Sequence, residues 1–123
     1  MTNDAPATAH IKAEIAREIT KVHRESYGNA SSNFEVAMET GLVVAIMDIE
    51  LSEAETTLIG AGDSDAVMTS HEAYRAAIAP TFTAIIERAT GRTVAEFTSR
   101  TVLTVNASWS VEVFRLRAAL APG

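Results

Sequence analysis

The chain has 123 residues, of which 47% are hydrophobic and 21% are charged, and its formal net charge is −6. These values are typical of one globular domain, so we expect residues 1–123 to form a single domain with flexible tails at about 1–7 and 118–123. The absence of cysteine excludes disulfides, thiolate catalysis and cysteine-ligated metals. No apolar run reaches the roughly 18 residues that span a bilayer, and the polar start resembles no signal peptide. We therefore expect a soluble, cytoplasmic protein without direct membrane insertion.

The basic residues avoid the middle of the chain, and no Lys or Arg occurs between Arg24 and Arg75. The acidic residues of that stretch are Glu25, Glu35, Glu39, Asp48, Glu50, Glu53, Glu55, Asp63, Asp65 and Glu72. Nucleic-acid binding normally requires a dense basic face, so this distribution argues against a nucleic-acid partner. A solvated surface that keeps the protein soluble explains the acidic stretch better.

The first predicted element is an amphipathic helix over about 8–27. Its apolar residues recur at steps of four, four and three and lie on one stripe: Ile11, Ile15, Ile19 and Val22. Gly28 is a suitable helix end, and the small polar residues 29–33 predict a loop.

An alternation of period two then predicts a β-hairpin. Its strands cover 34–39 and 42–51, and Thr40-Gly41 supplies the turn because glycine tolerates a positive φ. The second strand is apolar on both sides at its start, which favours a central position in the sheet. Further along, Asp48 and Glu50 are expected to face outward.

Two helices follow this hairpin. Residues 52–55 (Ser-Glu-Ala-Glu) form a capping box, which predicts a short helix over 53–60 that stops at the glycines of 60–62. A longer helix is expected over 65–90, ended by Gly91. One face of that helix carries Val67, His71, Tyr74, Ile78, Phe82, Ile85 and Ala89. Pro80 lacks an amide hydrogen, so we expect either a kink there or a division into two helices.

The last third of the chain is rich in Thr, Val and Phe. It predicts a strand over 93–105, a turn at 106–108 and a partner strand over 109–117. The whole order is α-β-β-α-α-β-β. An α+β fold, with a four-stranded antiparallel sheet and helices packed on one face, is the simplest packing that buries every apolar stripe.

The sequence contains no complete catalytic or metal-binding motif. His71-Glu72 begins like the helix motif of zinc proteases, but Arg75 stands where the second histidine is required. Nucleophile elbows and phosphate-binding loops are also incomplete. We therefore expect no catalytic residues, no metal site and no cofactor, and we expect His71 to be a hydrogen-bonded histidine at the core margin.

Three residues are candidates for contact with a ligand or partner. Arg75 could grip the carboxylate of a ligand, but a salt bridge to a neighbour such as Glu55 or Glu72 is favoured. Glu55 is favoured as a helix cap over a catalytic acid. Trp109, the single tryptophan, suits the core and a dimer contact equally well.

Several short segments occur together in a recognisable order. They are residues 41–44, the Leu-Ser-Glu-Ala-Glu-Thr-Thr-Leu run at 51–58, Tyr74-Arg75, the region of Pro80, residues 86–87, residues 90–92 and residues 113–116. Together they span about residues 10–117 and resemble the MpsC-like family of small prokaryotic proteins. The family takes its name from a member encoded with a cation-translocating system that generates membrane potential.

This resemblance implies a soluble accessory component, and it brings no established catalytic residues. Glu55, Arg75 and Gly91 match family positions. The family's Gly-Arg-Gly-Pro-like loop is replaced at 28–31, and Thr56 stands where the family places an arginine. Both differences remove positive charge, which argues against an anion-facing or membrane-facing role.

Three classes of function follow from these observations. We expect an accessory or interaction protein without enzymatic activity, acting as a homodimer that pairs sheet edges or helix faces, with a protein partner in a membrane-associated complex. The alternative is a regulatory domain that binds a small anionic molecule, with Arg75 lining a cleft. An enzyme is the third class, and it requires polar side chains that converge in a pocket.

Overall fold

Residues 5–27, 34–104 and 106–118 are described by the computed structural model. Their helices are α1 (Ala5–Tyr27), α2 (Glu53–Gly60) and α3 (Ser64–Thr90). Their strands are β1 (Phe34–Glu39), β2 (Leu42–Asp48), β3 (Val94–Val102) and β4 (Trp109–Leu116). The α+β class and the predicted order of elements are confirmed. Gly28, the expected loop at 29–33 and most of the two expected tails lie outside the described residues.

The four strands form one antiparallel sheet in the order β1-β2-β4-β3. Strand β1 pairs with β2 and β3 pairs with β4, as the two predicted hairpins require, but Gly41 does not adopt the positive φ expected at the first turn. Strand β2 also pairs with β4 along its whole length. The two hairpins therefore meet through their second strands, and β2 is central, as its apolar start predicts.

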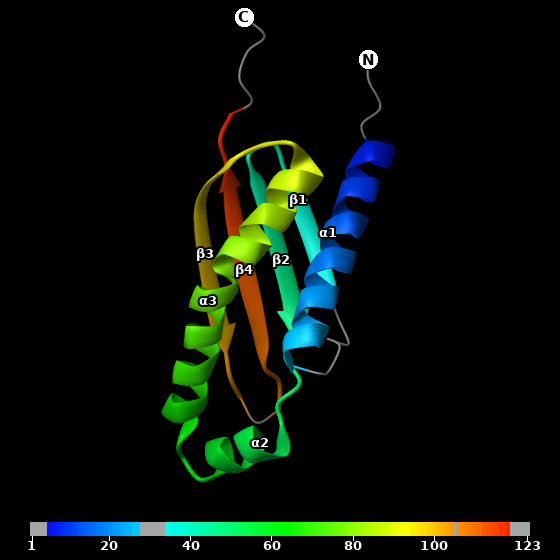
Figure 1. The fold of residues 1–123 in the computed structure, drawn as a ribbon. Coiled ribbons are helices and arrows are strands. Elements are labelled where there is room, and N and C mark those ends of the chain that lie inside the picture. The colour runs from blue at the N-terminus through cyan, green and yellow to red at the C-terminus, as the bar shows by residue number, and fades with distance from the viewer. Residues whose placement is uncertain (1–4, 28–33, 105, 119–123) are drawn as a thin grey trace, which may run out of the picture.

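The sheet has one covered face and one open face. Helices α1 and α3 lie side by side on the same face, with α1 against β1 and α3 against β3, whereas α2 lies beyond one end of the strands (Figure 1). This confirms the prediction that the helices pack on one side of the sheet.

The apolar core fills the layer between these two helices and the sheet. Its buried side chains come from α1, β2, α3 and β4, namely Ile15, Ile19, Val43, Ala45, Met47, Phe82, Ile85, Ile86, Phe114 and Leu116. The Phe97 and Phe114 rings stack with centroids 4.9 Å apart, and this contact joins β3 to β4 across one pair of the sheet register. Each large side chain of this core contributes about 1.5–3 kcal/mol through its removal from water.

Some predicted boundaries are wrong. Helix α1 begins at Ala5 rather than at 8, because Pro6 lies in its first turn, where no helical bond needs its amide. Strand β2 ends at Asp48 rather than at 51, although the Ile49 amide still donates to the Ser108 carbonyl, 2.8 Å away, in register with the β2–β4 pair. Strand β3 covers Val94–Val102 rather than 93–105, and β4 ends at Leu116 rather than at 117.

Of the two alternatives expected at Pro80, a kink or a division, the division of the long helix is wrong. Helix α3 runs as one element from Ser64 to Thr90 and contains Pro80. Pro80 and Ala76 are both exposed, so the carbonyl that loses its helical partner can bond to water. Gly91 ends the helix as expected, at φ 70°, a left-handed conformation that favours glycine.

Candidate functional site

The two halves of α3 present different chemistry to the sheet. Toward its C-terminus the helix buries only apolar residues, Phe82, Ile85 and Ile86, but toward its N-terminus it buries His71 and Arg75 beside Val67. Strand β4 changes in the same direction along its covered face, from Phe114 and Leu116 to Ser110 and Glu112. The layer between helix and sheet is therefore apolar at one end, whereas at the other end, called here the polar end, charged and polar side chains are buried among apolar ones.

An ion pair lies at the centre of this polar end. Arg75 Nη1 is 2.8 Å from Glu112 Oε1, and Arg75 Nη2 donates to Ser110 Oγ at 2.8 Å. Glu112 is fully buried, and Arg75 is only 5% exposed. The register places Glu112 between Ala45 of β2 and Ser99 of β3, in the middle of the covered face.

The electrostatics of Glu112 are set by opposing effects. Burial raises the pKa of its carboxyl, and the Arg75 guanidinium and the hydroxyls of Ser99 and Ser110 offset only part of that rise. Removing one member of such a buried pair leaves a charge without compensation in a low-dielectric interior, which typically costs about 3–5 kcal/mol. The arrangement makes Arg75 and Glu112 structurally dependent on each other.

Glu55 connects α2 to α3. Its Oε1 accepts from the Ser52 amide at 2.9 Å, and the Glu55 amide donates to Ser52 Oγ, so the predicted capping box is confirmed. Its second oxygen lies 2.8 Å from His71 Nε2. Burial alone would raise the pKa of the Glu55 carboxyl, but the bonds from the Ser52 amide and His71 outweigh burial and lower it. Glu55 is thus ionised at neutral pH and holds both helices.

His23 of α1 completes the polar end from the opposite side. Its side chain is 4% exposed, and its pKa falls to about 4 because of burial first, and then because of the nearby Arg75 and His71. His23 is therefore neutral at pH 7, and its protonation would add a charge to an interior that already contains a guanidinium.

The three predicted contact residues lie in two different places. Glu55 and Arg75 reach the polar end of the covered face, whereas Trp109 is 37% exposed on the open face and lies outside the core. Neither Glu55 nor Glu72 pairs with Arg75, so the predicted salt-bridge partner is wrong and Glu112 takes that place. Glu112 lies nearly forty residues along the chain, and only the sheet brings it under α3.

Sequence reasoning missed Glu112, although a signal was present. It shares the period-two alternation of Ser110, Phe114 and Leu116, so it falls on the same side of the strand as two large apolar residues. That position marks a carboxylate that needs a buried partner. The alternation of a single strand does not show which cationic side chain is the partner of this carboxylate.

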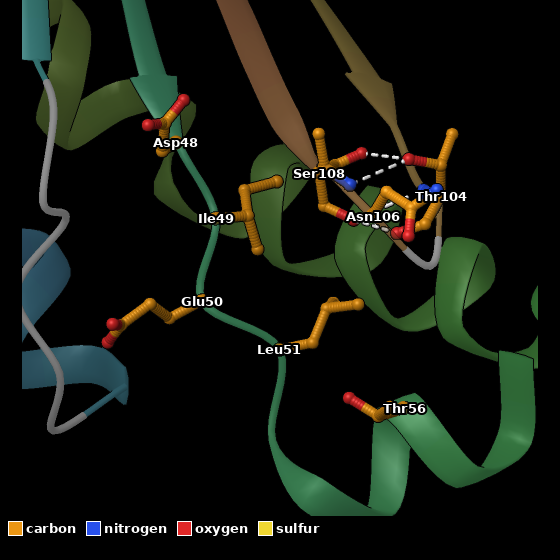
Figure 2. Close-up of a pocket in the computed structure, with 9 residues that line it drawn as sticks. Asp48, Ile49, Glu50, Leu51, Thr56, Thr104, Asn106 and Ser108 are labelled. Atoms are coloured by element: carbon orange, nitrogen blue, oxygen red, sulfur yellow. Dashed lines mark hydrogen bonds between the residues drawn. The ribbon is translucent and has the colours of Figure 1, made fainter.

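Two of the hollows in the described part of the chain lie near these residues. One, of about 360 Å³, lies between the end of β2, α2 and the connection from β3 to β4 (Figure 2). Thr104 and Ser108 bond to each other there and close the turn, while Asp48 and Glu50 point away from them. Among the described residues no group of three His, Cys, Asp or Glu side chains could hold a metal ion.

The other hollow, of about 420 Å³, lies between α3 and β3. Arg75 and Ser99 line its inner wall, and Arg100 and Glu72 line its rim. Both signs of charge meet in this hollow, because Glu72 is at the rim and Glu112 lies behind Arg75.

One comparison with known proteins gives a match. A family model described as "Na+-translocating membrane potential-generating system (MpsC)" matches residues 7–117, which is most of the chain. No curated protein and no solved structure matches the chain. In the described part of the chain, no helix is both long enough and apolar enough to cross a membrane.

Proposed function

Because this chain belongs to the MpsC family, whose description is a Na⁺-translocating system that generates membrane potential, we propose that it is an accessory protein of such a system. It acts without enzymatic activity, by contact with protein components of the membrane complex. It works in the cytoplasm and as a homodimer. The family match is the single observation that carries this proposal.

The chemistry of the polar end supports a structural role for its charged groups. Arg75 is engaged by Glu112 and Ser110, and Glu55 is engaged by Ser52 and His71. Groups that act on a substrate must instead converge on a space that the substrate can enter. In an accessory protein, these pairs would hold the helices over the sheet, and the surface would remain available for contact with protein partners.

Deletion of the gene in the organism that encodes it tests the function. We expect the Na⁺-dependent part of the membrane potential, followed with a potential-sensitive dye, to fall in the deletion strain and to return when the parent chain is supplied. The Arg75→Met variant, in which the polar end is disturbed, is supplied to the deletion strain in the same way, and we expect that it does not restore the membrane potential. An unchanged potential in the deletion strain would contradict the accessory role.

A second candidate function is the binding of a small anionic molecule. The hollow between α3 and β3 favours it, because the Arg75 guanidinium and the polar residues Ser99 and Thr101 line this space. Glu112 already neutralises Arg75, so an anion in this hollow would have to compete with Glu112 for the guanidinium.

A thermal-shift screen of anionic metabolites separates this candidate from the first. A ligand that binds the native state raises the melting temperature, and Arg75→Met should abolish that rise. Arg88→Ala, at an exposed position near the end of α3, is the matched control and should leave it unchanged. If no anion raises the melting temperature, the second candidate is ruled out in favour of the first.

A further inference from the structure

The open face of the sheet is apolar along its centre. We use "open face" for the side chains of the four strands that point away from α1 and α3. In β2 and β4 these include Leu42, Val44, Ile46, Trp109, Val111 and Val113. Ile46 and Trp109 are each 37% exposed. All the described helices lie on the other face or beyond the strand ends (Figure 1), so nothing in the described chain covers this apolar strip.

The strand register orders the open face into rows that cross the sheet. One row consists of Glu35, Ile46, Val111 and Arg100, from β1 to β3. It therefore has an acid at one edge, a base at the other and two large apolar residues between them. The next row, Ala37, Val44, Val113 and Thr98, has no charged side chain.

This pattern is complementary to itself. Consider a second copy stacked face to face, related by a two-fold axis that runs along the strands. The axis reverses each row, so Glu35 of one copy lies over Arg100 of the other, and Ile46 lies over Val111. Each pair occurs twice, as an isologous contact requires. We propose that the open face is the surface through which two copies of this chain dimerise in this orientation.

The end row limits where the contact is centred. It consists of Glu39, Leu42, Arg115 and Glu96, and reversal sets Glu39 over Glu96. Those like charges repel, although Arg115 of the second copy comes over Leu42, one strand from Glu39. The contact is therefore centred on the rows of Ile46 and Val44.

The size of the face sets the strength of the dimer. Four strands about 4.8 Å apart and seven residues at about 3.3 Å each give a face of roughly 19 by 23 Å. Two such faces bury on the order of 1,000 Å² of accessible surface, near the lower limit for a specific interface. We therefore expect a dimer that dissociates on dilution.

A membrane surface is a less suitable occupant than a second copy. The open face carries four acids, Glu35, Glu39, Asp48 and Glu96, against the two bases Arg100 and Arg115, and the cytoplasmic leaflet is negatively charged. Edge-to-edge pairing through β1 or β3 would leave the apolar strip exposed to water. Both alternatives predict results that differ from those of face-to-face stacking in the experiment below.

Sedimentation of the full chain through the micromolar range, with charge-swapped variants, tests the surface. We expect the parent chain to pass from monomer to dimer with rising concentration. Glu35→Arg or Arg100→Glu sets like charges against each other twice per dimer and should weaken the dimer at least about tenfold. The double variant E35R/R100E restores opposite charges and should return the dissociation constant to near the parent value.

Matched controls carry the same charge changes away from the open face. Glu25→Arg on α1 and Arg88→Glu on α3 are exposed and should leave the dimer unchanged. Trp109, the only tryptophan, gives an independent signal, because its emission should shift to the blue as the dimer forms. Circular dichroism at each step verifies that the variants are folded.

Three outcomes would overturn the proposal that the open face is the dimer interface. They are a chain that stays monomeric at all concentrations, single charge swaps that leave the dimer intact, and a double swap that does not restore the dissociation constant. The second of these is the result that edge pairing predicts. This inference deepens the homodimer of the proposed function and rests on it. The two tests remain separable, because sedimentation uses the purified chain alone, whereas the accessory role is read from membrane potential in cells.

Discussion

The two faces of one sheet reverse the usual relation between polarity and burial. On the covered face, Glu112 has no exposed surface, whereas on the open face Ile46 and Trp109 are each 37% exposed. Glu112 and its neighbours Val111 and Val113 follow one another in the same strand. Residue type therefore does not decide burial in this sheet. What lies above the strand decides it, because α3 brings a guanidinium to Glu112 and nothing described lies over Ile46.

The largest expected effect comes from separating the buried ion pair. Arg75→Met or Glu112→Leu alone should lower the free energy of unfolding by about 3–5 kcal/mol, because each leaves a buried charge without its partner. The double variant should return to within about 1 kcal/mol of the parent chain or exceed it, since apolar side chains then fill the space. Urea denaturation at pH 7 measures all three. Losses that simply add in the double variant would show that the pair is not interdependent.

The exposed pair of Arg17 and Glu14 is the matched control for this cycle. Their charged atoms are 3.9 Å apart, and the Arg17 side chain is 68% exposed. Glu14→Ala should change the free energy of unfolding by less than about 1 kcal/mol, as is usual for solvated pairs.

Adjacent residues of β2 test the two faces directly. Met47 is buried on the covered face, and Ile46 is next to it on the open face. Met47→Ala should cost about 2–5 kcal/mol, since it leaves a cavity in the core. Ile46→Ala should cost about 1 kcal/mol or less when measured at a dilution that favours the monomer. Equal losses from the two substitutions would mean that the open face is covered in solution even without a second copy.

The polar end should make stability depend on pH through His23. Its pKa is about 4 in the folded chain, below the ordinary value of 6.5, so the unfolded chain binds the proton more readily. The stabilisation is complete above about pH 6.5 and is lost as the pH falls toward 4, by about 3 kcal/mol in total.

The free energy of unfolding of the parent chain and of the His23→Gln variant, measured by urea denaturation between about pH 4 and pH 6.5, isolates the contribution of His23. Glu112, whose raised pKa acts in the opposite direction, contributes to both chains and cancels in the difference. His10→Gln, at an exposed position in the same helix, should give a profile that superimposes on that of the parent. A His23→Gln profile as steep as the parent's would place the proton uptake on another group.

The smallest expected effect belongs to the cap of α2, which joins neither face of the sheet. Ser52→Ala removes the hydroxyl that accepts from the Glu55 amide and should cost about 1 kcal/mol. Thermal unfolding followed by circular dichroism measures it, with Ser70→Ala at an exposed position on α3 as control. A loss as large as that from Arg75→Met would mean that the cap also supports the polar end, through Glu55 and His71.

The sequence by itself determined the elements, because each depends on contacts between residues close along the chain. The isoleucine stripe of α1, the alternation of β1, the capping box at 52–55 and the end of α3 at Gly91 are all local patterns, and the structure contains each of them. The family resemblance is also carried by short segments in order.

Only the tertiary structure decided how those elements combine. No local pattern distinguishes β1-β2-β4-β3 from other antiparallel orders, because every strand edge offers the same backbone donors and acceptors. The partner of Arg75 and the exposure of Trp109 both follow from that order and from the face on which α3 packs. They depend on residues far apart along the chain, and their free energies exist only after the helices and the sheet have come together.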